Sequence, residues 1–161
     1  LSAEEIERLA MAHEQAVNPV EPMPYAAETL RALSAQGVRL GLISNAQFYT
    51  VPAMEACLGA SLHELGIDPG LCVFSYRERR AKPDVRLFEI ARAALLERGI
   101  AVRNALFVGN DVRNDIEPAK AAGFRTALFA GDARSLRLRG RTLEESGADH
   151  VIDDLRGLGR R

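Results

Sequence analysis

The stretch Ala105-Leu-Phe-Val-Gly-Asn-Asp-Val-Arg-Asn-Asp-Ile-Glu-Pro-Ala-Lys-Ala-Ala-Gly-Phe124 decides the fold class of this chain. Its first four residues are apolar and have the length of a short buried strand. The segment from Asn114 to Ala122 is predicted to form a helix, and Gly123 is a typical residue to end it. The sequence therefore predicts a strand, a polar turn rich in Asn and Asp, and a helix in direct succession.

The same alternation of strand and helix extends outward from this stretch in both directions. Further short apolar strands are predicted at residues 38–43, 71–74, 126–129 and 150–152, and helices at 2–17, 25–35, 50–65 and 84–98. Strands of this length that alternate with amphipathic helices are typical of the α/β class. We expect a parallel sheet with helices on both of its faces.

A proline-rich segment divides the chain near its N-terminus. Ser2 and Glu5 have the spacing of a capping box at the start of the predicted N-terminal helix. The segment Asn18-Pro-Val-Glu-Pro-Met-Pro24 follows, and its three prolines lack the backbone donors that a helix requires. We therefore predict a boundary here, with residues 1–22 separate from a core over residues 23–161.

The composition limits which class of protein this is. The 161 residues suffice for one domain, and the net charge of −1 favours neither nucleic acid nor an anionic membrane as a partner. Only two cysteines are present, which argues against a disulfide framework or a zinc site. No apolar run reaches the roughly 20 residues of a membrane span, and the first residues lack a signal-peptide core. We expect a cytoplasmic protein with no nucleic acid and no membrane among its partners.

Polar residues follow the predicted strands at the points where open parallel sheets bind ligands. Ser44 and Asn45 come directly after the strand at 38–43, where a hydroxyl and backbone N–H groups suit a phosphoryl oxygen. A turn or a helix cap is the alternative interpretation of this pair. Lys82 stands in the sequence Lys-Pro-Asp at the start of a predicted helix. Helix-start chemistry accounts for the proline and the aspartate, whereas Lys82 has a role only if an anion such as a phosphate lies nearby.

The turn in the opening stretch carries the strongest chemical signal. Asp111 and Asp115 lie four residues apart after a strand, and Mg²⁺ prefers carboxylate oxygens at such a place. The alternative is that Asp111 or Asn114 caps the following helix. Capping requires one such residue, whereas this turn has four Asn or Asp residues in six positions. The pattern therefore favours a metal site.

Together these segments resemble the haloacid dehalogenase (HAD) superfamily. Leu-Ile-Ser-Asn45, Lys82-Pro-Asp and Val108-Gly-Asn-Asp-x-x-Asn-Asp115 resemble its second, third and fourth motifs in order, distance and strand placement. The resemblance covers about Met23 to Asp154. It implies a Rossmann-like core that acts on a small phosphorylated substrate through an aspartyl-phosphate, with Mg²⁺ as the cofactor.

The resemblance also implies roles for individual residues. Ser44 would bind the phosphoryl group, helped by the backbone near Asn45. Lys82 would steady the nucleophile and the charge that develops on the phosphate. Asp111 and Asp115 would hold Mg²⁺, directly or through water.

The fourth motif departs from the family pattern at one position. In the family an aspartate commonly follows the glycine of this motif, but here Asn110 occupies that place. We expect Asp111 to take over the metal role by a shift of one position. Coordination through the amide oxygen of Asn110 is the alternative.

The first motif of the family, an Asp-x-Asp after an apolar strand, has no counterpart upstream of Ser44, because no Asp occurs before Asp68. In the family this strand lies centrally, between those predicted here at 38–43 and 105–108. We therefore expect the central motif-one strand to be absent and this chain to be an inactive fragment of a longer enzyme. A missing N-terminal segment or a dimer partner would complete the sheet, and residues 1–22 would be a remnant of a helical cap.

Alternatives to an Mg²⁺-dependent phosphatase stay open at this point. One is a non-catalytic domain that keeps the fold for binding or regulation, and another is a metal-independent haloacid dehalogenase. The pair Asp111 and Asp115 favours phosphate and metal over halide. A separate feature is the segment Arg134-Ser-Leu-Arg-Leu-Arg-Gly-Arg141, which has four arginines in eight residues. It is either a solvated loop or a segment that binds an anion.

Overall fold

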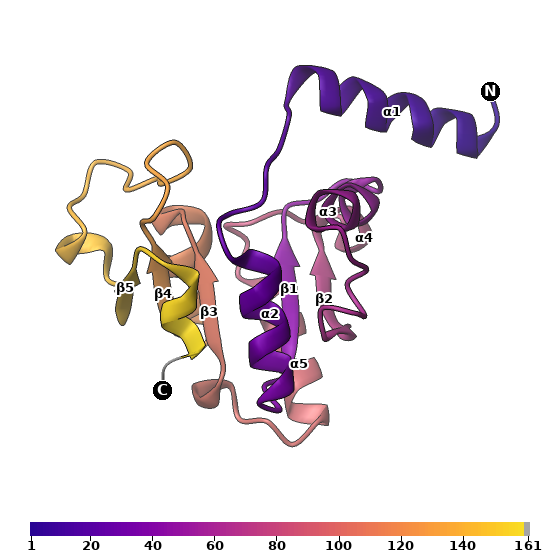
Figure 1. The fold of residues 1–161 in the computed structure, drawn as a ribbon. Helices are drawn as coiled ribbons and strands as arrows, with labels where there is room; N and C mark the ends of the chain where they lie inside the picture. The colour runs from indigo at the N-terminus through magenta and orange to yellow at the C-terminus, as the bar shows by residue number, and fades with distance from the viewer. Residues whose placement is uncertain (160–161) are drawn as a thin grey trace.

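The computed structural model describes residues 1–159, which form an α/β fold with parallel strands (Figure 1). β1 (Leu40–Ser44) pairs with β2 (Ile67–Phe74). A second sheet has the order β3 (Leu106–Gly109), β4 (Arg125–Phe129), β5 (His150–Ile152). The predicted α/β class with parallel strands is confirmed. Residues 160–161 of the predicted core lie outside the described residues.

The division between the two sheets falls between β1 and β3. Within residues 1–159, β1 pairs with β2 alone and β3 pairs with β4 alone, so each has one edge without a strand partner. This is the place where the sequence predicted that a central strand is absent. The two sheets are held together through side chains, because Ile43 of β1 and Phe107 of β3 pack against the same buried cluster.

Each predicted helical range contains a helix, and the structure adds short helical turns that were not predicted, α4, η1, η3 and η4. The helical elements are α1 (Ala3–Val17), α2 (Ala26–Ala35), α3 (Thr50–Leu58), α4 (Ser75–Glu78), α5 (Arg86–Glu97), α6 (Glu117–Ala121), the 3₁₀ turns η1 (Val102–Asn104), η3 (Glu144–Ser146) and η4 (Leu155–Gly159), and the π-helical turn η2 (Val112–Ile116). In the part of the chain that the structure describes, no helix is both long and apolar enough to cross a membrane.

Three local features differ from the sequence prediction. The helix expected at 50–65 ends at Leu58, because Gly59 adopts a left-handed conformation with φ 64°. The strand expected at 71–74 begins earlier, at Ile67, because an irregularity in its register accommodates the intervening Asp-Pro-Gly. The helix expected at 114–122 is divided into η2 and α6, since the Asp-rich turn closes a wider π-helical ring first.

Helix α1 stands away from the two sheets (Figure 1). It has no buried residue, and an extended segment that contains the three prolines joins it to α2. The predicted capping box is present, since Ser2 N donates to Glu5 Oε2 at 2.7 Å and Glu5 N donates to Ser2 Oγ at 3.2 Å. One contact to the core is the hydrogen bond from Tyr49 Oη to Glu14 Oε2 at 3.2 Å.

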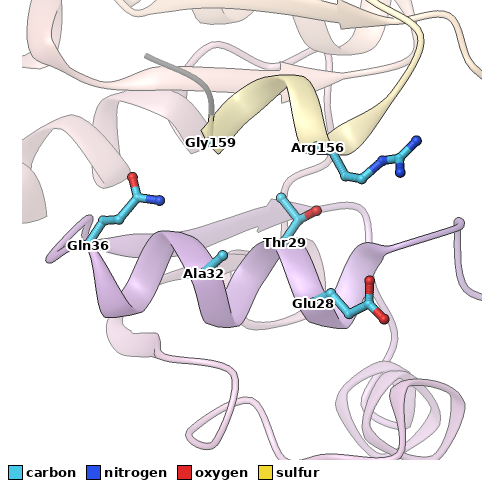
Figure 2. Close-up of a pocket in the computed structure, with 6 residues that line it drawn as sticks. All are labelled: Glu28, Thr29, Ala32, Gln36, Arg156 and Gly159. Carbon is cyan, nitrogen blue, oxygen red and sulfur yellow. The ribbon is translucent and has the colours of Figure 1, made fainter.

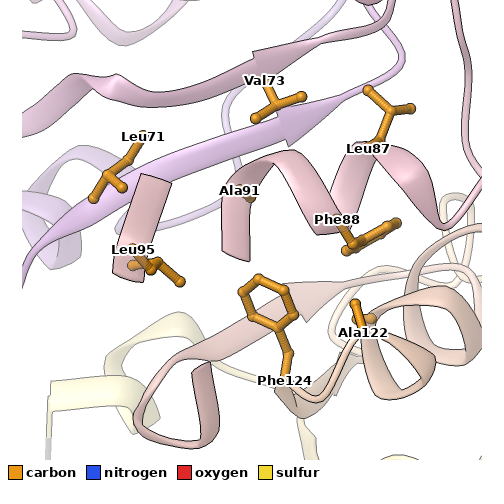
Figure 3. Close-up of a cluster of buried hydrophobic side chains, with 9 residues drawn as sticks. Leu71, Val73, Leu87, Phe88, Ala91, Leu95, Ala122 and Phe124 are labelled. Atoms are coloured by element: carbon orange, nitrogen blue, oxygen red, sulfur yellow. The ribbon is translucent and has the colours of Figure 1, made fainter. Parts of the chain in front are cut away.

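The largest buried cluster lies where α5 packs between the strands (Figure 3). The apolar face of α5 is buried there, with Leu87, Phe88, Ala91 and Leu95. Phe88 is fully buried, and its ring meets Phe107 and Phe124 edge to face, with centroids 5.0 and 6.2 Å apart. Phe88 thus joins α5 to β3 and to the residue that precedes β4.

Phe88→Ala is expected to lower the free energy of unfolding by about 3–5 kcal/mol, because it removes buried apolar surface and leaves a cavity. The control is Leu96→Ala in the same helix, whose residue is 72% exposed. That control is expected to change stability by less than about 0.5 kcal/mol. Urea denaturation of both variants measures the difference, and similar losses in the two would contradict the packing described for Phe88.

Candidate functional site

A cavity of about 330 Å³ opens at the carboxyl ends of β1 and β3. It is lined by Ser44, Asn45, Lys82, Asn110, Asp111, Asn114, Asp115, Ser135 and Arg137. All six residues that the sequence singled out as site residues are among them, although they come from three separate segments. The sequence did not single out Asn114, Ser135 or Arg137 as site residues. Parallel topology explains the convergence, since the carboxyl ends of the strands meet at one edge.

The side chain of Asn45 holds the backbone of Lys82. Lys82 N donates to Asn45 Oδ1 at 2.6 Å, and Asn45 Nδ2 donates to Lys82 O at 3.1 Å. This paired contact joins the loop after β1 to the segment before α5, 37 residues along the chain. The sequence pointed to the backbone near Asn45 as a ligand for phosphate, whereas the amide side chain positions the lysine.

A second contact fixes the loop after β1. Ala46 N donates to Ser75 Oγ at 2.9 Å, and that hydroxyl donates to Ala46 O at 3.0 Å. Ser75 is the first residue of α4, directly after β2. The loop after β1 is therefore anchored both to the segment before α5, through Lys82, and to the start of α4, through Ser75.

Lys82 forms an ion pair with Asp115 at the floor of the cavity. Lys82 Nζ donates to Asp115 Oδ1, and the two side chains are only 14% and 6% exposed. A charge-assisted hydrogen bond that is largely shielded from water is stronger than one at the surface. The ammonium group also lies 5.7 Å from the centroid of the Phe107 ring. Lys82 is thereby held in one place beside the cavity.

The second oxygen of Asp115 is bound by the backbone of the turn. Asn110 N and Asp111 N each donate to Asp115 Oδ2 at 3.0 Å. Gly109 makes this close approach possible, because a Cβ atom built there would lie 2.4 Å from Asp115 Cβ. The turn between β3 and η2 therefore encloses the carboxylate and presents it to Lys82.

Asp111 has the contacts of a helix cap and of an ion pair. Its Oδ1 accepts from Arg113 N at 3.0 Å and Asn114 N at 3.1 Å, and Arg139 donates to both of its carboxylate oxygens. Burial raises the pKa of the Asp111 carboxyl, but the hydrogen bonds from Arg139 and the turn backbone outweigh burial and lower this pKa below its usual value. The capping alternative is thus realised, and a metal role for Asp111 stays a prediction.

The arginine-rich segment 134–141 packs beside the turn. Arg137 N donates to Asn110 O at 2.8 Å, and Val112 N donates to Arg137 O at 3.0 Å. Leu136 and Leu138 pack against a buried cluster of Val112, Ile116 and Leu128. The segment is therefore held by backbone hydrogen bonds and by two packed leucines, and its Ser135 and Arg137 line the cavity.

The oxygen atoms at the cavity fit Mg²⁺ in kind. Mg²⁺ is usually bound by one or two carboxylates together with substrate phosphate and water. Asp115 and Asp111 supply two carboxylates, and Asn110 supplies an amide oxygen, since its amide nitrogen donates to Ser135 O at 2.5 Å. Among residues 1–159 no group of three or more His, Cys, Asp or Glu side chains could hold a metal by itself. Such a site would need oxygen atoms from substrate and water.

A second cavity of about 230 Å³ lies between α2 and the C-terminal turn η4 (Figure 2). Glu28, Thr29, Ala32, Gln36, Arg156 and Gly159 line it. Thr29 Oγ1 is buried there and has no hydrogen-bond partner among the described residues. This cavity has neither a lysine nor a cluster of carboxylates, so the chemistry of a phosphate site is found at the first cavity.

Known proteins resemble this chain over most of its length. The sequence profile of the haloacid dehalogenase-like hydrolases matches residues 2–123. Phosphoglycolate phosphatase of Escherichia coli is 38% identical over 101 residues, and glyceraldehyde 3-phosphate phosphatase of Methanothermobacter thermautotrophicus is 30% identical over 140 residues. The crystal structure of an HAD phosphatase from Thermococcus onnurineus has a TM-score of 0.71 at 20% identity, which shows a similar fold.

The relatives are longer than the matched part of this chain. The E. coli match covers 62% of this chain and 36% of that protein, and the M. thermautotrophicus match covers 86% and 58%. The match to the T. onnurineus structure covers 95% of this chain and 62% of that protein chain.

Gly109→Ala is expected to lower the free energy of unfolding by about 1–3 kcal/mol, because the new methyl group must displace Asp115 from its backbone donors. Gly157→Ala is the matched control, since a Cβ atom there would meet nothing within 4 Å. Thermal and urea unfolding compare the two variants. Equal stability of Gly109→Ala and Gly157→Ala would show that the turn does not need its glycine.

Proposed function

Because this chain belongs to the haloacid dehalogenase-like hydrolases, we propose that it is part of an Mg²⁺-dependent phosphatase for a small phosphorylated substrate. The reaction would pass through an aspartyl-phosphate. The observation that carries the proposal is the buried ion pair of Lys82 with Asp115 on the same cavity as Ser44. A fixed cation and a hydroxyl beside a carboxylate suit the binding and transfer of a phosphoryl group.

Each residue has a distinct part in this proposal. Ser44 would donate its hydroxyl to a phosphoryl oxygen, and the backbone after it would assist. Lys82 would neutralise charge on the phosphate and on the attacking carboxylate. Asn45 would position Lys82 through its two hydrogen bonds to the lysine backbone. Because these contacts are already made in the structure, little reorganisation is needed when substrate binds.

Asp115 would hold Mg²⁺ together with either Asn110 or Asp111. Bound Mg²⁺ would neutralise phosphate oxygens and orient the ester for in-line attack. The sequence favoured Asp111 as the first ligand, but its carboxylate is engaged by Arg139 and by the start of η2. The amide of Asn110 is oriented by its donation to Ser135 O. These contacts favour Asn110 with Asp115 as the metal ligands.

The nucleophilic aspartate would come from residues outside 1–161. Within residues 1–159 the cavity has two carboxylates, Asp111 and Asp115, and each is bound by a cationic side chain. Neither is therefore suited to act as the nucleophile. The unpaired edges of β1 and β3 support a strand between them, supplied by a further segment of the protein or by a dimer partner. The 161 residues would be inactive without it. Residues 1–22 would belong to a cap that closes over the site.

The location of the protein is part of the same proposal. Cys57 and Cys72 are both free thiols, which supports the reducing environment of the cytoplasm. A net charge of −1 supports neither nucleic acid nor an anionic membrane as a partner.

A metal-independent dehalogenase is the second candidate function. The observation that favours it is that both carboxylates of the cavity are paired with cations of the chain itself, Asp115 with Lys82 and Asp111 with Arg139. A site neutralised in this way has less need of Mg²⁺. The metal dependence of the reaction separates the two candidates.

The full-length protein is expected to hydrolyse an aryl phosphate with Mg²⁺ and to lose this activity when EDTA is added. Asp115→Asn should lower kcat by about 10²–10³-fold, because it weakens both the metal site and the anchor of Lys82. The exposed Asp153→Asn serves as the control. Activity that is unaffected by EDTA, or hydrolysis of a haloacid with no phosphatase activity, would contradict the proposal and favour the second candidate.

A further pair of variants identifies the first metal ligand. Asn110→Ala is expected to raise the Mg²⁺ concentration for half-maximal activity by about 10-fold or more. Asp111→Asn should mainly lower stability, because it weakens the pair with Arg139. Metal titrations and urea unfolding of both variants distinguish these effects. The reverse outcome would return the metal role to Asp111, as the sequence predicted.

A further inference from the structure

Among the described residues, one arginine at the cavity has no carboxylate to balance its charge. Four arginines stand in the segment 134–141, and three of them have an acidic partner. Arg134 pairs with Asp132, Arg139 with Asp111, and Arg141 with Glu117. Within residues 1–159, the guanidinium of Arg137 instead donates to two backbone carbonyls, those of residues 134 and 136, at 2.7 and 3.0 Å. It is also the arginine of this segment that lines the cavity.

Once the ion pairs around the cavity are counted, Arg137 contributes the remaining positive charge. Lys82 neutralises Asp115, and Arg139 neutralises Asp111, so these two pairs contribute no net charge. Both hydrogen bonds of the Arg137 guanidinium use Nη1, which leaves Nε and Nη2 for a ligand. These two nitrogens form the planar fork that binds a carboxylate through two parallel hydrogen bonds.

The backbone holds Arg137 in a fixed position relative to the motif that carries Asp115. Its N–H donates to Asn110 O and its carbonyl accepts from Val112 N, so the residue is bonded on both sides of the turn. The neighbouring Leu136 and Leu138 are packed inward. Alternation along this extended segment therefore directs Arg137 away from the buried cluster. Arg137 is thus held at the cavity wall by the backbone of the turn, and its side chain lies outside the buried cluster.

We propose that Arg137 binds a carboxylate of the substrate, so that the enzyme prefers small phosphate monoesters that carry a carboxylate. The proposal rests on the phosphatase function proposed above, with the phosphoryl group at Ser44 and Lys82. A volume of about 330 Å³ is near the lower end of the range for ligand pockets, which suits a substrate of few atoms. Arg137 determines specificity in this proposal and takes no part in the chemical step.

The test compares two nearly isosteric esters in the full-length enzyme, 2-phosphoglycolate and its carboxamide, 2-phosphoglycolamide. Arg137→Gln is expected to lower kcat/KM for the carboxylate ester by about 10–100-fold, mainly through KM. The carboxamide ester should lose less than about 3-fold. Arg137→Lys keeps the charge but loses the planar fork, so its kcat/KM for the carboxylate ester should lie between the values of the wild type and Arg137→Gln.

Arg134→Gln is the matched control, because Arg134 has an 81% exposed side chain and does not line the cavity. It should leave both esters unaffected. An equal loss on both esters in Arg137→Gln would assign Arg137 to the phosphoryl group and overturn the proposal. No loss on either ester would also overturn it. Unfolding midpoints of the variants, expected to match the wild type, show that the fold is retained.

A binding measurement separates this inference from the phosphatase function. Calorimetry in EDTA measures the affinity for each ester without hydrolysis. The inference is supported if the wild type binds 2-phosphoglycolate more tightly than the carboxamide and Arg137→Gln loses this preference. This holds even if neither ester is hydrolysed with Mg²⁺. The lack of hydrolysis would contradict only the phosphatase function. Equal affinity for the two esters overturns the inference, whatever the activity.

Discussion

The carboxylate of Asp115 is the constraint on which the arrangement of the cavity depends. One of its oxygens accepts two backbone N–H groups of the turn after β3, and the other accepts the ammonium group of Lys82. Both partners are largely shielded from water, so separating them would leave a buried charge uncompensated. Because Asn45 in turn grips the backbone of Lys82, this single carboxylate sets the position of three segments that are remote in sequence. The absence of a side chain at Gly109 permits the whole arrangement.

Charge compensation organises the rest of the cavity in the same way. Asp111 caps η2 and pairs with Arg139, which lowers the pKa of its carboxyl and keeps it ionised. The two acidic residues that resemble a metal site therefore also serve the structure of the turn. These roles are compatible, since a carboxylate oxygen accepts more than one donor. Arg137 is distinctive because, within residues 1–159, its guanidinium donates to backbone carbonyls and forms no ion pair with a carboxylate.

The fold shows how an α/β architecture holds together when its sheet is divided. β1 and β3 share no backbone hydrogen bonds, yet both pack against the cluster around Phe88 of α5. Apolar side-chain contacts can bridge the division because they are not directional. In the described part of the chain, the backbone N–H and C=O groups at the facing edges of β1 and β3, in contrast, lack the hydrogen-bond partners that a neighbouring strand would supply. The divided sheet and the family membership together give a physical reason to look for a strand between β1 and β3.

The sequence by itself determined the order of strands and helices, the fold class and six residues that line the cavity, among them Ser44 and Lys82. These depend on local periodicity and on which residues follow strand ends, and both are written in consecutive residues. Element ends at Leu58 and in η2 were less predictable, because they depend on backbone geometry within a turn. Only the tertiary structure decided that Asn45 holds Lys82, that Asp111 pairs with Arg139, and that Arg137 faces a cavity. The physical reason is that these hydrogen-bonded and ion-paired partners lie 28 and 37 residues apart along the chain, and only the packing of strands and helices determines which side chains meet.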